Sequence, residues 1–154
     1  MTNIDWCKGI ELSLVEFATA YDFAGDRFQV EHLSAPHRRP SHLPYGQMAI
    51  YAFWHDGHGW LKIGKAGPSS DARFCHQHYN GCALSTLNGA LRSDPVMPTF
   101  GWNRGAVGRW AAAKTCRTNI LMPADLGPTL LSDLEAFLIN RHKPRYEGRR
   151  SYAR

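Results

Sequence analysis

Residues 47–79, QMAIYAFWHDGHGWLKIGKAGPSSDARFCHQHY, have the pattern of a β-hairpin followed by a helix. Two β-rich runs, 47–54 and 60–63, flank the segment His-Asp-Gly-His-Gly, which supplies the Asp and Gly residues that turns require. The second run ends at Gly64. Residues 68–71, Pro-Ser-Ser-Asp, then provide Ser and Asp side chains that can cap a helix N-terminus. The predicted helix carries Arg73, His76 and His78.

The length and composition of the chain favour one globular domain. It has 154 residues, of which 44% are hydrophobic and 20% are charged, and these are ordinary values for a domain with a buried core. No apolar run approaches the ~20 residues that span a bilayer, and the first residues lack the basic-then-apolar order of a signal peptide. We therefore expect a soluble, cytoplasmic protein without a membrane partner.

The net charge of +5 is unevenly distributed along the chain. Residues 1–46 contain four Lys/Arg and six Asp/Glu, a net charge of −2, whereas residues 47–154 contain fourteen and seven, a net charge of +7. The basic part therefore includes the predicted hairpin. Such a surplus of positive charge is typical of a surface that meets phosphates.

Residues 1–46 are predicted to pack on the core formed by residues 47–154. Apolar side chains recur at helical spacing up to a predicted end near Gly25. The segment 34–45, SAPHRRPSHLPY, contains three prolines together with Arg38 and Arg39, a composition that favours an extended loop. It is either an arm that follows a nucleic-acid backbone or a linker that crosses the surface. The apolar positions of the helix are Ile10, Leu12, Leu14, Val15, Phe17, Ala18 and Tyr21.

Residues 82–113 form an insertion with weak secondary-structure signals. Short helices are predicted over 82–91 and 107–113, separated by the helix-breaking segment 94–98, Asp-Pro-Val-Met-Pro. Trp102, Arg104 and Arg109 are candidates for base stacking and phosphate binding. Packing of the tryptophan and solvation of the arginines are the alternative.

The C-terminal third has the pattern of a strand followed by a helix. Residues 115–121 alternate in the manner of a third strand, and 129–141 carry one apolar face, with Glu135 beside that face. The last fourteen residues contain six Lys/Arg and one Glu, a composition typical either of a solvated, frayed chain end or of an extension of the predicted phosphate-binding surface. The basic candidates here are Lys143, Arg145, Arg149 and Arg150.

Four segments together resemble the GIY-YIG endonuclease family. Ala49-Ile50-Tyr51 is similar to its first motif, and Lys62-Ile63-Gly64, followed by Lys65, to a variant of its second, in which a tyrosine is usual at the lysine position. Arg73 stands where the family has a catalytic arginine. Residues 134–139, followed by Lys143-Pro144, resemble the helix that carries the family's metal-binding glutamate. The resemblance implies an α/β fold of the α+β type, with a small three-stranded, mainly antiparallel sheet flanked by helices and preceded here by an N-terminal extension.

The resemblance also implies a metal-dependent hydrolysis of phosphodiester bonds. In this interpretation Tyr51 takes the proton from water, Arg73 binds the phosphate, and Glu135 holds one Mg²⁺ or Mn²⁺ ion. An isolated phenol has a pKa near ~10, so a neighbouring ammonium is needed to favour the phenolate, and Lys62 on the paired strand is the candidate. His76 and His78 are both candidate proton relays.

Three functions are compatible with these residues. The first is an endonuclease acting on double-stranded DNA in restriction, repair, mobile-element spread or defence, with Lys65 among its nucleic-acid contacts and with a homodimer needed to cut both strands at one place. The second is a catalytically inactive nucleic-acid-binding module on the same fold. The third is a structural zinc protein, which would draw its ligands from Cys75, His76, His78 and Cys82.

Overall fold

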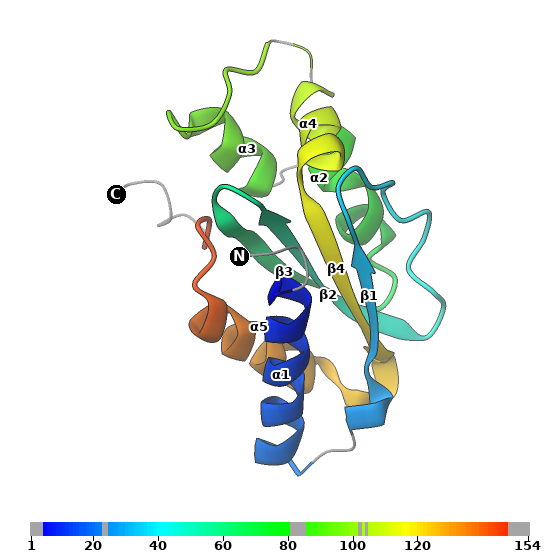
Figure 1. The fold of residues 1–154 in the computed structure, drawn as a ribbon. Coiled ribbons are helices and arrows are strands. Elements are labelled where there is room, and N and C mark those ends of the chain that lie inside the picture. The colour runs from blue at the N-terminus through cyan, green and yellow to red at the C-terminus, as the bar shows by residue number, and fades with distance from the viewer. Residues whose placement is uncertain (1–4, 23–24, 81–85, 102, 104, 148–154) are drawn as a thin grey trace.

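The computed structural model describes residues 5–22, 25–80, 86–101, 103 and 105–147. Its centre is an antiparallel sheet of four strands in the order β1-β4-β2-β3 (Figure 1). The fold is therefore mixed α/β, as expected, although the predicted number of three strands was wrong. The strands are β1 (Gln29–Leu33), β2 (Gln47–His55), β3 (Gly59–Ala66) and β4 (Cys116–Pro123).

The additional strand, β1, comes from the N-terminal segment that was expected to form only a helix and a loop. It pairs with β4 along its whole length, from Gln29 opposite Leu121 to Leu33 opposite Arg117. The helix before it, α1 (Asp5–Ala20), ends five residues before Gly25, the predicted end. The N-terminal segment thus contributes to the same sheet as the predicted hairpin.

The predicted hairpin is confirmed. Strands β2 and β3 pair from Ala49 opposite Ala66 to His55 opposite Gly59, with an irregularity between Phe53 and Trp54. Strand β3 continues two residues beyond Gly64. Because β3 pairs only with β2 in the sheet order, it forms one edge.

Each face of the sheet is covered by its own set of helices. Alternate residues of β2 point to opposite faces, because side chains in a strand have a period of two. Met48, Ile50 and Ala52 pack with helices α1 and α5 (Pro128–His142), whereas Tyr51 and Phe53 pack toward the other face. The second face is covered by a π-helical turn, Ala72–His76, and by α2 (Gln77–Asn80), α3 (Thr86–Ser93) and α4 (Ala106–Lys114).

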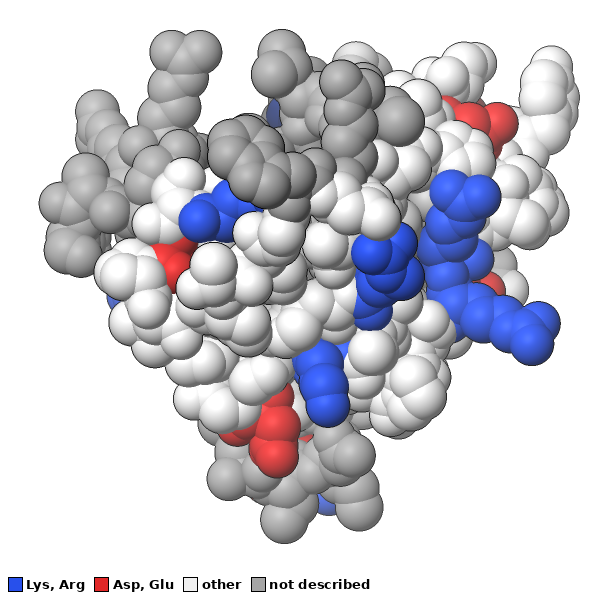
Figure 2. Space-filling model, turned by 90° about the horizontal axis from the view of Figure 1, so that it is seen from above, with Lys and Arg blue, Asp and Glu red and all other residues white. Residues whose placement is uncertain are grey.

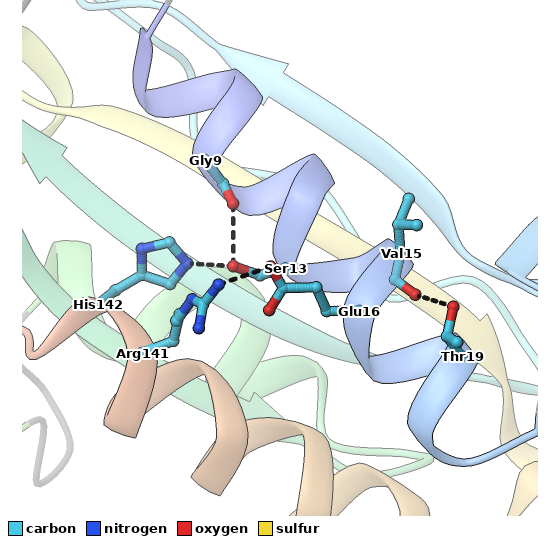
Figure 3. A network of polar contacts seen from close by, with 7 residues as sticks. All are labelled: Gly9, Ser13, Val15, Glu16, Thr19, Arg141 and His142. Atoms are coloured by element: carbon cyan, nitrogen blue, oxygen red, sulfur yellow. Dashed lines mark hydrogen bonds and ion pairs between the residues drawn. The ribbon is translucent and has the colours of Figure 1, made fainter.

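Helices α1 and α5 are joined by polar contacts as well as by apolar packing (Figure 3). The Ser13 hydroxyl donates to the Gly9 carbonyl at 2.9 Å and lies 2.9 Å from His142 Nε2. Arg141 forms an ion pair with Glu16 beside this contact. These contacts fix the C-terminal end of α5, and so help to hold Glu135 at a set position relative to the sheet.

The Pro-rich arm is attached to the second face through the buried side chain of His37. Its ring Nδ1 lies 2.8 Å from the Thr115 carbonyl oxygen, and Nε2 lies 2.8 Å from the Tyr79 hydroxyl. Farther along the arm, the Leu43 amide donates to an Asp71 carboxylate oxygen at 2.6 Å. Asp71 was expected to cap the following helix, but it makes no side-chain cap bond and holds the arm instead.

The segment 82–113 contributes α3 and α4 to the second face. The described part of helix α3 covers the second half of the helix predicted over 82–91, and residues 82–85 lie outside the described part of the chain. The helix predicted over 107–113 is confirmed as α4. It crosses α2 so closely that a Cβ on Gly108 would lie 1.6 Å from the Tyr79 carbonyl oxygen.

The chain after α5 runs along the free edge of β3. The amides of Arg145 and Tyr146 donate to the carbonyls of Trp60 and Leu61 at 2.8 and 2.9 Å. Asp94, which follows α3, accepts from Arg145 Nε and from the Tyr146 hydroxyl, both at 2.6 Å. This segment therefore covers part of the sheet edge. Within the described residues, no helix has the length and apolar character needed to cross a membrane.

Candidate active site

Tyr51, the predicted base, is buried on β2 with a relative exposure of 4%. Its hydroxyl lies over Gly64 on the neighbouring strand, where a Cβ would come within 2.5 Å of the phenol oxygen. Its ring lies 4.7 Å from the His78 ring and 6.3 Å from the Phe53 ring. The phenol therefore extends from β2 over the neighbouring edge strand, β3.

Lys62 and Arg73 lie on the same side of the sheet as Tyr51. Lys62 pairs with Phe53, whose side chain is on this face. Arg73 is exposed and lies in the π-helical turn, a kind of turn that is frequent at functional sites. Burial lowers the pKa of Lys62; the Glu135 carboxylate raises that pKa, and the Arg73 guanidinium lowers it. The charges of Glu135 and Arg73 thus have opposite effects on the Lys62 ammonium.

Glu135 lies on α5, the helix on the opposite face. Its carboxylate oxygen Oε2 lies 3.2 Å from Lys65 Nζ, which also donates to the Ser132 hydroxyl at 2.9 Å. The Glu135 side chain is 23% exposed. Its charge acts on the pKa values of Tyr51 and Lys62. Its contact residue Lys65 pairs with Ile50, whose side chain is on the α1/α5 face, so the carboxylate approaches the edge of β3 from the face opposite Tyr51.

The phenol of Tyr51 is a weak acid in this environment. Burial raises its pKa to about 12, and the Glu135 carboxylate contributes to the rise. The guanidiniums of Arg73 and Arg117 oppose that rise. The predicted lowering of the Tyr51 pKa by Lys62 is therefore not found: the pKa rises, and the charges that oppose the rise belong to two arginines, of which Arg117 was not predicted.

The two candidate histidines occupy different environments. His78 is 2% exposed, and burial, followed by the charges of Arg117, Lys62 and Arg73, lowers its pKa to about 3. It therefore stays neutral at physiological pH and packs against Tyr51. His76 is half-buried, and its Nδ1 lies 3.1 Å from Arg39 Nη1. Of the two histidines, His76 is the one that solvent reaches.

The predicted phosphate-binding residues separate into three groups. Arg38, Arg39, Arg109 and Lys143 are exposed, and Lys65 is half-buried beside Glu135. Arg145 is engaged in an ion pair with Asp94, so its guanidinium supports the chain after α5. Trp102, Arg104, Arg149 and Arg150 lie outside the described residues.

One face of the molecule displays this positive charge. Figure 2 shows the end that carries α3 and α4, and blue Lys and Arg side chains cover more of this face than red Asp and Glu side chains do. The Arg39 guanidinium lies beside His76, three residues after Arg73 in the chain. The Pro-rich arm therefore brings a cation next to the turn that carries Arg73.

Sequence reasoning missed Arg117, which is fully buried on β4 beneath the Tyr51 face. The sequence did contain a signal for it. Every second residue of 116–123 is Cys, Thr, Ile or Met, as in a strand with a buried face, and a charged residue is rare in an inner strand. A charged residue in such a strand requires buried partners. The partners could not be read from the sequence, because they come from the separate segments that contain Phe74 and Tyr79.

The donor atoms at the site suit a hard divalent cation that keeps most of its water ligands. Glu135 offers a partly exposed carboxylate next to Lys65, and Mg²⁺ is commonly held by one or two carboxylates. Lys65 occupies one carboxylate oxygen and competes with a cation there. Among the described residues, no three His, Cys, Asp or Glu side chains are grouped so as to hold a metal ion. Of the residues proposed for zinc, Cys75 is a buried free thiol and Cys82 lies outside the described part.

Comparison of the chain with family models, with curated proteins and with solved structures found no match. The functional assignment therefore depends on the residues themselves and on the geometry described above.

Proposed function

We propose that the protein is a phosphodiester hydrolase of the GIY-YIG type, acting on nucleic acid as an endonuclease. The observation that supports this most is the placement of Tyr51, Lys62 and Arg73 on one face of the sheet, next to the edge strand β3, which Glu135 approaches from the other face through its ion pair with Lys65. The Arg73 guanidinium lowers the pKa values of Tyr51 and Lys62, and the Glu135 carboxylate raises both. A phenol, an ammonium, a guanidinium and a carboxylate around this edge strand supply the groups that phosphodiester hydrolysis needs.

Each residue has a separate task in this proposal. Arg73 is exposed and presents a planar, permanently charged fork that binds two phosphate oxygens. Tyr51 acts in its phenolate form, whose oxygen takes a proton from the attacking water, and Lys62 stabilises the charge that develops near the scissile phosphate. Glu135 would hold Mg²⁺ or Mn²⁺, which would polarise the phosphate and offset the charge of the carboxylate.

Double-stranded DNA is the proposed substrate. The exposed cations Arg38, Arg39, Arg109 and Lys143 would contact the phosphate backbone, which gives affinity without sequence information. Because one chain carries one such site, a cut through both strands at one place would require a homodimer. Restriction, repair, mobile-element spread and defence are the processes in which such an enzyme would act.

Nicking of supercoiled plasmid tests this function. Wild-type protein in Mg²⁺ or Mn²⁺ is expected to convert the plasmid to the open circle, and EDTA is expected to stop the reaction. Glu135→Ala and Tyr51→Phe should each abolish nicking. Glu16→Ala and Tyr21→Phe, which change an ion-paired glutamate and a half-exposed tyrosine on or next to α1, are matched controls and should cut at the wild-type rate.

An inactive nucleic-acid-binding module is the second candidate. The ion pair between Lys65 and Glu135, together with the raised pKa of Tyr51, favours it, because both features oppose catalysis. This candidate predicts that DNA binding persists and that no cleavage occurs in either metal. A band-shift assay beside the nicking assay separates the two functions.

A further inference from the structure

Arg117 carries a buried charge, and no carboxylate of the described residues is in direct contact with it. Its side chain is fully buried, with a relative exposure of 0%. The guanidinium donates to the Asn119 side-chain oxygen at 2.7 Å, to the Tyr79 hydroxyl at 2.9 Å and to the Phe74 carbonyl at 2.6 Å. None of the ion pairs formed by the described residues includes Arg117. All three acceptors are neutral.

Aromatic rings surround the same guanidinium. Its Cζ atom lies 4.9 Å from the centre of the Phe74 ring and 5.2 Å from that of Phe53. The rings of Tyr51 and Tyr79 follow at 5.6 and 5.7 Å. Ring faces attract a cation, and this attraction is stronger where water is excluded.

The negative charge that this hydrogen-bond network reaches is one side chain away from Arg117. Asn119 Nδ2 donates to Glu31 Oε2 at 3.4 Å, so the Asn119 amide links the guanidinium to an exposed carboxylate on β1. A buried cation held only by neutral groups is costly, and an apolar side chain of similar size would usually fill the position at a lower cost. The position of this charge under Tyr51 therefore calls for a function beyond packing.

We propose that Arg117 is a positioning residue for the active site, which fixes the Arg73 turn through the Phe74 carbonyl and presents a buried positive charge to the Tyr51 phenol. This inference rests on the proposed role of Tyr51 as the base. Phe74 directly follows Arg73, so the hydrogen bond from Arg117 holds the backbone of the phosphate-binding turn. The same guanidinium favours the phenolate form of Tyr51.

Four other side chains act on the Tyr51 environment from the surrounding elements. The Arg73 guanidinium, on the π-helical turn, lowers the pKa of Tyr51, and the Glu135 carboxylate, on α5, raises that pKa. The His78 ring, from α2, is neutral and lies 4.7 Å away. Lys62 lies on β3, next to the strand that carries Tyr51. Loss of the Arg117 charge leaves the Glu135 carboxylate less opposed, so the pKa of Tyr51 must rise.

The experiment measures the Tyr51 phenol directly. Tyrosines are replaced by 3-fluorotyrosine, whose phenol is more acidic and titrates at a pH that the fold withstands, and the Tyr51 signal in the ¹⁹F NMR spectrum is assigned with Tyr51→Phe. Wild type is compared with Arg117→Met, Arg117→Lys and Asn119→Asp. Asn119→Asp keeps the Arg117 guanidinium and places a carboxylate next to it, which offsets its charge. Arg27→Met, which removes a surface arginine paired with Asp125, is the control.

We expect Arg117→Met and Asn119→Asp to move the Tyr51 titration to higher pH by about one unit, which lowers the phenolate fraction about tenfold at a given pH. Arg117→Lys and Arg27→Met should leave the titration close to wild type. The rise of the plasmid-nicking rate with pH should shift upward by the same amount in the first two variants. Should Arg117→Met fail to fold, Asn119→Asp provides the same comparison.

An unchanged Tyr51 titration in folded Arg117→Met or Asn119→Asp would overturn the proposal. So would a shift in Arg117→Lys as large as that in Arg117→Met, because packing alone would then explain both. The NMR titration does not require catalysis. A protein that cuts no DNA but shows the expected titration would contradict the proposed function and leave the electrostatic role of Arg117 supported.

Discussion

The Tyr51 hydroxyl lies so close above Gly64 that a Cβ on residue 64 would come within 2.5 Å of the phenol oxygen. The two residues are opposite each other on β2 and β3. Because Tyr51 is buried, its ring cannot swing away from an added methyl group without displacing neighbours such as His78. Only glycine at residue 64 leaves enough space for the phenol in this position at the edge of the sheet.

We expect Gly64→Ala to displace the Tyr51 phenol and to abolish nicking. Overpacking of this kind costs about 1–3 kcal/mol, which leaves a protein of ordinary stability folded. Urea unfolding measures the stability change, and plasmid nicking at a temperature where the variant is folded measures the activity. Gly89→Ala is the control, since Gly89 is exposed inside α3 and an added Cβ there would have nothing within 4 Å. That variant should be as active as wild type and up to about 1 kcal/mol more stable. Full activity in Gly64→Ala would contradict the role given to the Tyr51 position.

The Asp94 ion pair predicts a loss of stability in acid. Hydrogen bonds from Arg145, and then from Tyr146, hold the pKa of this carboxyl well below its usual value near ~3.9, despite burial. A lowered folded-state pKa means that the pair stabilises the fold above about pH 4 and loses this effect as the pH falls further. We expect Asp94→Asn to cost roughly 2 kcal/mol at pH 7, below the range for fully buried pairs because Arg145 is partly exposed.

The measurement is urea unfolding of wild type and Asp94→Asn between pH 7 and pH 2. The two curves of stability against pH should converge below about pH 4, as the wild-type carboxyl becomes protonated. Asp125→Asn, which breaks the exposed pair with Arg27, should change stability by no more than about 0.5 kcal/mol at any pH. A constant difference between wild type and Asp94→Asn down to pH 2 would show that the ionised pair is not the cause.

Lys65 is expected to compete with a divalent cation for the Glu135 carboxylate. Its ammonium lies 3.2 Å from Oε2, and a partly exposed pair of this kind is worth up to about 1 kcal/mol. Lys65→Met should therefore tighten Mn²⁺ binding by roughly fivefold. Electron paramagnetic resonance of free Mn²⁺ gives the dissociation constant, with Glu135→Ala as the variant that loses the site and Lys114→Met as a control. Binding that weakens in Lys65→Met would contradict this competition.

Elements with a strong local pattern were predictable from the sequence. The hairpin β2–β3, the strand β4 and the helix α5 each have a regular apolar period and clear turn residues, so packing agrees with local preference. The same patterns placed Tyr51 and Lys62 on the paired strands of the hairpin, Arg73 in the turn after it and Glu135 on the last helix. The resemblance in motif order supplied the hypothesis that they form one site.

The contacts that join distant segments were not predictable. Strand β1 is short and polar, and only its pairing with β4 makes it a strand. Asp71 had the spacing of a helix cap, but the Leu43 amide of the arm competes for its carboxylate. The buried charge of Arg117 depends on acceptors from Phe74 and Tyr79, which no local period reveals.

The central claim is that Tyr51 and Glu135 belong to one catalytic unit, although they lie on a strand and on a helix of the opposite face. A double-mutant cycle of nicking rates tests it most directly. Tyr51→Phe and Glu135→Gln should each lower kcat/KM by at least about 100-fold, since each removes a group that acts in the transition state. The double variant should be no more than a few-fold slower than the slower single variant, because groups that act as a unit are non-additive. Wild-type rates in either single variant, or losses that multiply in the double variant, would contradict the claim.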